Sequence, residues 1–214
     1  MSTADEYADL TGPGGAWTLF RWEAYDPANR VDLCASALAV DDRLFFVDPI
    51  PLAREALAEL TAGRTPAGII VTNGNHARAA DAFRRRWKVP LASTAEAAAD
   101  AGLEVDQLIP AEGGPVLCDA FRAISLAGGA VGEVALHRAD GEGVLIVGDA
   151  IINLPSYPLG RLPDKYCANP RELRRSVSRL LDLPFSKMLF AHGEPVLSRA
   201  HERLSAALNV GERP

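Results

Sequence analysis

The feature that most constrains the fold is a pattern that occurs twice along the chain. Short segments in which apolar and polar residues alternate come first, and an almost wholly apolar segment with predicted helices before and after it comes next. In the first half, alternation of apolar and polar residues predicts an antiparallel meander with a turn at Asp41-Asp42. The alternating segments are residues 16–25, 31–40 and 43–49. The apolar segment 67–72 (AGIIVT) predicts a strand covered on both faces. Helical spacing predicts helices over 51–63 and 77–88, a short strand over 90–94 and an Ala-rich segment over 95–102.

The second half repeats this plan. Strands are expected over 115–127, 132–140 and 143–152, with Asp140-Gly141 as a hairpin turn. Three prolines and no clear period predict a long loop over 153–169. A helix over 171–183, a strand over 187–192 and a helix over 194–208 complete the chain. Two mixed sheets that face each other, with helices on both outer sides, form a four-layer αββα sandwich of the α/β (α+β) class.

Composition limits the function classes. The 214 residues carry no linker-like segment, so one domain over 1–214 is expected. A net charge of −6 argues against a nucleic-acid-binding surface, which needs a dense array of Lys and Arg. Neither a leader segment nor a membrane-spanning run is seen, and three widely spaced cysteines without a CxxC pair are typical of reduced thiols. A cytoplasmic protein that binds neither nucleic acid nor membrane is therefore predicted.

Polar and glycine residues follow four of the predicted apolar strands, where α/β proteins gather functional groups. These strand ends are Thr72–Arg78 (TNGNHAR), Leu126–Gly132 (LAGGAVG), Gly148-Asp149 and Ala191–Gly193 (AHG). Their order and surroundings resemble the metallo-β-lactamase superfamily, whose signature is THxHxDH, a GHTPG-like turn, GD and a final His. The resemblance spans about residues 15–205 and implies the αββα fold.

Most metal ligands that the resemblance implies are replaced. Asn73 and Asn75 stand at the first two His positions, Ala77 at the Asp and Arg78 at the last His. Gly129 stands where the turn has its His, whereas Asp149 and His192 match the family's positions. A catalytic zinc needs three protein ligands, and two would give about 5 to 8 kcal/mol, or micromolar to submillimolar affinity. No cofactor is therefore expected.

One residue keeps a metal possible. His76 lies next to Asn75, and a shifted loop register would bring its imidazole toward Asp149 and His192, giving a His2Asp site for zinc or another divalent metal. The alternative is that His76 is exposed or bonded to nearby backbone. Asp48, at a strand end, is expected to be structural.

Two functions remain open. The first is a non-catalytic binding or regulatory protein whose remodelled cleft takes a polar small molecule or a protein partner. That cleft would contain Asn73, Asn75, His76, Arg78 and Gly129. The second is a hydrolase that uses His192 and Asp149, either with one metal at His76, Asp149 and His192 or as a metal-free acid/base pair. A homo-oligomer is also possible.

Overall fold

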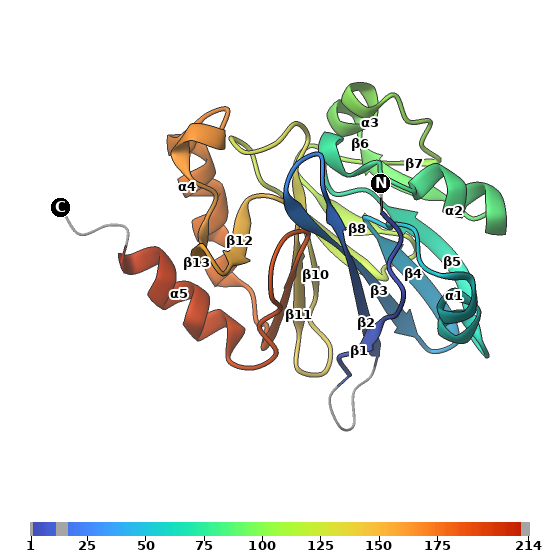
Figure 1. The fold of residues 1–214 in the computed structure, drawn as a ribbon. Coiled ribbons are helices and arrows are strands. Elements are labelled where there is room, and N and C mark those ends of the chain that lie inside the picture. The colour runs from blue at the N-terminus through green and yellow to red at the C-terminus, as the bar shows by residue number, and fades with distance from the viewer. Residues whose placement is uncertain (1, 12–16, 211–214) are drawn as a thin grey trace.

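The computed structural model describes residues 2–11 and 17–210. Its main feature is two mixed sheets packed face to face (Figure 1). The first sheet has the order β1 (Ala8–Asp9), β2 (Thr18–Asp26), β3 (Val31–Val40), β4 (Arg43–Val47), β5 (Thr65–Ile70), β6 (Leu91–Thr94) and β7 (Gln107–Ile109). The second has the order β14 (Lys187–Phe190), β11 (Val144–Val147), β10 (Val134–Arg138), β9 (Phe121–Ser125) and β8 (Gly114–Val116). Each sheet is antiparallel in its meander and becomes parallel where helical crossovers begin, at β4–β5 and at β11–β14.

Helices cover the outer face of each sheet, as Figure 1 shows. The helices α1 (Arg54–Thr61), α2 (Ala80–Trp87) and α3 (Ala95–Ala101) lie on the side of the first sheet, and α4 (Pro170–Ser178) and α5 (Ala200–Val210) on the side of the second. The helix α4 begins where Asn169 accepts a hydrogen bond from the Glu172 N–H and Pro170 occupies the first turn. Among the described residues, the remaining helical elements are the 3₁₀ turns Gly74–His76, Asp164–Tyr166 and Arg179–Asp182.

Three apolar clusters correspond to the three interfaces between the four layers. Leu38 and Phe45 of the first sheet pack with Leu136 and Ile146 of the second, which forms the central core. Phe46 belongs to the cluster under α1 and α2. The third cluster joins the second sheet to α4 and α5. The predicted αββα sandwich is confirmed.

Several predicted boundaries were wrong. The expected strand 115–127 is split into β8 and β9, because Leu117, Cys118 and Asp119 have positive φ angles and form a turn. The expected loop 153–169 contains a two-stranded hairpin, β12 (Ile151–Leu154) with β13 (Tyr157–Arg161). The last helix begins only at Ala200, after Arg199 with a φ of 51°. Residues 1, 12–16 and 211–214, which include the start of the first predicted strand and of the predicted core, lie outside the described residues.

Two other observations bear on the sequence predictions. No helix in the described part of the chain is both long and apolar enough to cross a membrane. Cys34, Cys118 and Cys167 are free thiols.

Candidate metal centre

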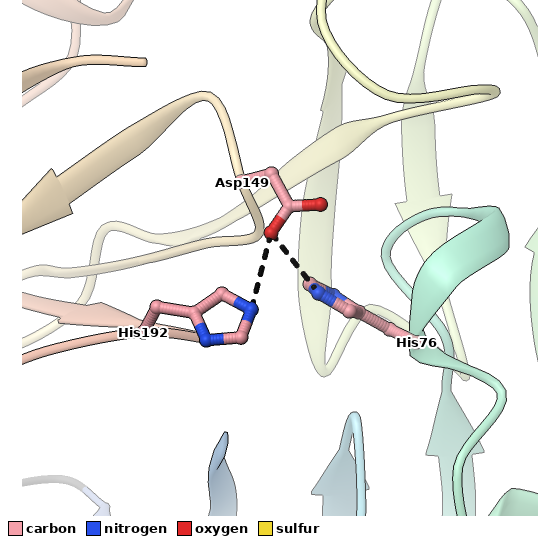
Figure 2. Close-up of side chains that lie close together, drawn as sticks. All are labelled: His76, Asp149 and His192. Atoms are coloured by element: carbon pink, nitrogen blue, oxygen red, sulfur yellow. Dashed lines mark ion pairs between the residues drawn. The ribbon is translucent and has the colours of Figure 1, made fainter. Parts of the chain in front are cut away.

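Three side chains from three separate strand ends converge at one edge of the two sheets. His76 closes the 3₁₀ turn that follows β5, Asp149 follows β11, and His192 follows β14. Figure 2 shows both imidazole rings directed at one carboxylate oxygen of Asp149. The Asp149 Oδ1 atom lies 3.2 Å from His76 Nε2 and 3.4 Å from His192 Nε2.

The His76 ring is held from behind by a buried carboxylate. Its Nδ1 atom lies 2.9 Å from Asp48 Oδ2. Thr72 donates its N–H to Asp48 Oδ1 at 2.8 Å and its hydroxyl to Oδ2 at 2.6 Å, which fixes that carboxylate. Because a carboxylate accepts hydrogen bonds, Nδ1 directs its proton at Asp48, so a neutral His76 ring would have its lone pair on Nε2, the atom that faces Asp149.

The His192 ring has the same arrangement with a different partner. Its Nδ1 atom lies 2.9 Å from the Asp32 carbonyl oxygen, which only accepts, so Nε2 again faces Asp149. Gly193 places this ring, since its φ of 99° and its close approach to Asn153 leave no room for a side chain. A Cβ atom at Gly193 would lie 2.2 Å from the Asn153 carbonyl oxygen.

Polar side chains from the segment after β5, which also carries His76, lie around Asp149. Asn73 and Asn75 donate their amide N–H groups to Asp149 Oδ2 at 3.2 and 3.1 Å. Arg78 donates through Nη1 to the Cys34 carbonyl at 2.7 Å, and its Nη2 atom lies 3.5 Å from His192 Nε2. The Asp149 carboxylate thus accepts from two amides and faces two imidazoles.

The electrostatics of the cluster favour ionised carboxylates. Burial opposes the ionisation of Asp149, but His76 and His192 hold its pKa well below the ordinary value. Burial likewise opposes ionisation of Asp48, and His76 outweighs it, so the Asp48 pKa is also lowered. Burial and Arg78 both disfavour the charged form of His76, yet Asp149 and Asp48 raise its pKa to about 9. Without a metal, the His76 ring is therefore doubly protonated at neutral pH, with the Nε2 proton facing Asp149, and a metal bound at Nε2 would displace that proton.

These residues fit a divalent metal ion. One ligand atom each from His76, Asp149 and His192 lies within 4.8 Å of the others. His76 Nε2 is buried and has no hydrogen bond of good geometry within the described residues, but it faces Asp149 Oδ1 at 3.2 Å, so a divalent ion between these two atoms would satisfy both. Two imidazoles and one carboxylate, with a carboxylate or carbonyl behind each ring, are a usual donor set for catalytic zinc. The expectation that no metal is bound is therefore not supported by the structure.

A cleft of about 590 Å³ adjoins the cluster. Its lining includes Asn75, His76, Arg78, Asp149 and His192, together with residues of the β2–β3 hairpin. Asn73 is fully buried beneath Asp149. Gly129 does not line this cleft but a neighbouring hollow, together with Glu133.

The sequence interpretation did not include Glu133. Its buried carboxylate accepts from the Ala150 N–H at 2.6 Å and from the Ala130 N–H at 3.2 Å, and so joins the glycine-rich turn to the backbone beside Asp149. Burial and the nearby Asp149 raise the Glu133 pKa to about 8. A carboxylate directly after a glycine-rich turn, at the start of an apolar strand, is the signal that could have identified it.

Fold and site together define an αββα protein with a candidate metal centre where strands of both sheets end. A protein-family model described as metallo-beta-lactamase superfamily matches residues 16–209. The chain therefore belongs to the metallo-beta-lactamase superfamily, as the strand-end motifs predicted.

Solved structures share the fold at low sequence identity. The metallo-beta-lactamase DIM-1, in a crystal exposed to ceftazidime, is 13% identical with a TM-score of 0.73, covering 98% of this chain and 99% of that chain. TMB-1 is 12% identical with a TM-score of 0.72, covering 97% and 99%. The mono-zinc form of FIM-1 from Pseudomonas aeruginosa is 11% identical with a TM-score of 0.71, covering 99% and 98%. No curated protein matched the sequence of this chain.

Proposed function

We propose that the protein is a hydrolase with a single divalent metal ion, zinc in the first instance, held by His76, Asp149 and His192. One observation carries this proposal: two imidazole Nε2 atoms, each fixed by an acceptor behind the ring, face the same Asp149 oxygen. A divalent cation at such a site supplies Lewis acidity and activates water for attack.

The residues of the chain have separate roles in this proposal. His76 and His192 present their lone pairs, and Asp149 supplies the negative charge that the metal requires. Asp48 and the Asp32 carbonyl keep the two rings in the required tautomer. The adjoining cleft of about 590 Å³ has the volume of a small-molecule site. We therefore propose a small polar molecule as the substrate.

A second candidate is the non-catalytic binding protein. Asn73 and Asn75 already donate to Asp149, and Arg78 lies against His192 Nε2. These contacts give Asp149 and His192 partners without a metal. In this case the same cleft binds its ligand through amide and guanidinium groups alone.

Zinc titration of the chelator-stripped protein separates the two candidates. Linear scaling of the affinity of four-ligand structural zinc sites gives three ligands about 8 to 12 kcal/mol, or a Kd between micromolar and nanomolar. We expect one equivalent to bind in this range, and His76→Ala to weaken binding by at least about 100-fold. His201→Ala is the matched control, because His201 lies in α5 on the outer side of the second sheet, where its ring bonds to the Leu181 carbonyl and packs against Phe185.

Two results would contradict the metal proposal: no saturable zinc binding by the wild-type protein, or the same affinity in folded His76→Ala. Either result leaves the binding protein as the function that the cleft supports. Mass spectrometry of the metal content of tag-free protein gives the stoichiometry independently.

We further propose that the chain acts as one domain in the cytoplasm, without nucleic acid or membrane partners. The free thiols and the net charge of −6 support this proposal. Light scattering on the eluted protein decides between a monomer and a homo-oligomer.

A further inference from the structure

We infer that the cleft recognises an anionic substrate, a carboxylate or a phosphate monoester, and that Arg78 is the residue that binds its charge. The inference rests on the proposed metal centre, because the metal sets the charge of the site. It goes beyond that proposal by naming the class of substrate and the residue that selects it.

The Arg78 guanidinium is fixed in place before any ligand arrives. Its Nη1 atom donates to the Cys34 carbonyl at 2.7 Å and approaches the Asp48 carbonyl at 3.4 Å. These two carbonyls lie on the strand β3 and at the end of β4. A guanidinium that is already oriented loses little entropy when it binds an anion, and its planar fork matches carboxylate and phosphate oxygens.

The second nitrogen of Arg78 lacks a good partner. Nη2 lies 3.5 Å from His192 Nε2, a distance at the limit for a hydrogen bond. When His192 Nε2 serves as a metal ligand, its lone pair no longer accepts from Nη2. Because Arg78 lines the cleft beside His192, this donor is then available to a ligand in the cleft.

The charge of the site points the same way. With neutral imidazole rings, Asp26, Asp48, Asp149 and Arg78 together carry two net negative charges, and a divalent cation brings the sum to zero. The repulsion that the carboxylates exert on an anion is then offset, and Arg78 can attract the anion. The carboxylate of Asp26 is held by hydrogen bonds from Asn29 and the Ala28 N–H.

The rest of the cleft suits a small apolar body. Ala28, Val31 and Leu33 of the β2–β3 hairpin line it. The expected ligand therefore has a compact apolar part against the hairpin and an anionic group against Arg78.

Calorimetric titration with three probes of similar size tests the inference on full-length protein, metal-free and zinc-loaded. Phenylacetate and phenylphosphonate carry the charge, and phenylacetamide is the uncharged comparison. We expect the zinc-loaded protein to bind at least one anion about 10-fold or more tightly than the amide, and Arg78→Met to weaken that anion by about 10- to 100-fold, as for a charged hydrogen bond. Whichever of phenylacetate and phenylphosphonate binds more tightly identifies the anionic group of the substrate as a carboxylate or a phosphate.

Arg85→Met is the matched control, because Arg85 is exposed, pairs with Asp81 across one helical turn and lies away from the cleft. It should leave all three affinities unchanged. If Arg78→Met does not fold, as judged by circular dichroism, Arg78→Lys serves instead. It keeps the positive charge but removes the planar fork of donors, and it should also weaken binding of that anion.

Equal binding of the amide and both anions, or unchanged anion binding in folded Arg78→Met, would overturn the inference. The zinc titration on the same samples separates it from the proposed function. Zinc binding without Arg78-dependent anion binding refutes the anion site alone, whereas the absence of saturable zinc binding refutes the metal centre whatever the anions do.

Discussion

At the scale of single residues, the ability of the site to hold a metal depends on how the two histidine rings are oriented, and not only on their presence. Asp149 and His192 were predictable, because they follow apolar strands in the GD and AHG contexts. His76 was predictable only as one alternative, since its burial depends on Asp48, which is 28 residues away in the sequence. Nothing in the local sequence indicates that a ring next to two asparagines is held by a distant carboxylate.

Asp48→Asn tests whether this carboxylate positions His76. The substitution keeps the size of the side chain but replaces a charged acceptor of the Nδ1 proton with a neutral amide. Loss of such an outer partner typically lowers metal affinity about 10- to 100-fold, and we expect that loss in a zinc titration against a competing chelator.

Asp106→Asn is the control, because Asp106 also accepts a main-chain N–H, from Leu91, but lies away from the cluster. A folded Asp48→Asn protein with wild-type zinc affinity would show that Asp48 has no role in positioning the ring.

At the scale of elements, long apolar segments were predicted well and short polar ones poorly. The strand β11, with four buried residues, and the parallel strand β14 beside it follow directly from their sequences. The hairpin β12–β13 was missed because Pro155 and Pro158 favour a loop in local sequence. Its contacts with α5 and with Gly193 come from parts of the chain that local patterns do not include.

Gly193→Ala tests the contact between β12 and the loop that carries His192. A Cβ atom there would collide with the Asn153 carbonyl, and the positive φ angle adds backbone strain. We expect a loss of about 2 to 4 kcal/mol in the free energy of unfolding, measured with urea, together with weaker zinc binding.

Gly63→Ala is matched in backbone conformation, with a φ of 69°, but its Cβ atom would have no neighbour within 4 Å. It should cost about 1 kcal/mol and leave zinc binding unchanged. Equal effects of the two substitutions would mean that the contact with Asn153 is easily relieved.

At the scale of the whole molecule, the two predicted half-domains are present, and the cluster forms where they meet. Asp48 and His76 follow strands β4 and β5 of the first sheet, and Asp149 and His192 follow β11 and β14 of the second. The Val134 N–H donates to the Thr72 carbonyl at 2.9 Å and joins the two sheets beside the site. The repeated order of strands and helices predicted this architecture. The contacts between the halves were not predictable, because they join residues that are far apart in the sequence.

The buried titratable groups at this junction predict how stability depends on pH. For Glu133, with a folded pKa of about 8, and His76, with one of about 9, the folded chain keeps a proton that the unfolded chain has released. The free energy of unfolding of the metal-free protein should therefore fall as pH rises, from about 4.5 to 8 for Glu133 and from about 6.5 to 9 for His76. Each group contributes a slope of at most about 1.4 kcal/mol per pH unit.

Urea unfolding in the presence of a chelator measures this dependence. Glu133→Gln should reduce the slope between about pH 4.5 and 5.5, where His76 is almost fully protonated in both states and contributes little. A Glu133→Gln protein with the wild-type slope in that range would contradict the raised pKa of Glu133.

The position of the cluster between the two sheets links ligand occupancy to the lifetime of the folded chain. A ligand that contacts His76 on one side and Asp149 and His192 on the other is released when the halves separate. It therefore stabilises the entire chain by an amount that grows with the logarithm of its free concentration. Under the proposed function, the cellular abundance of this protein should then follow the supply of the metal that the cluster binds.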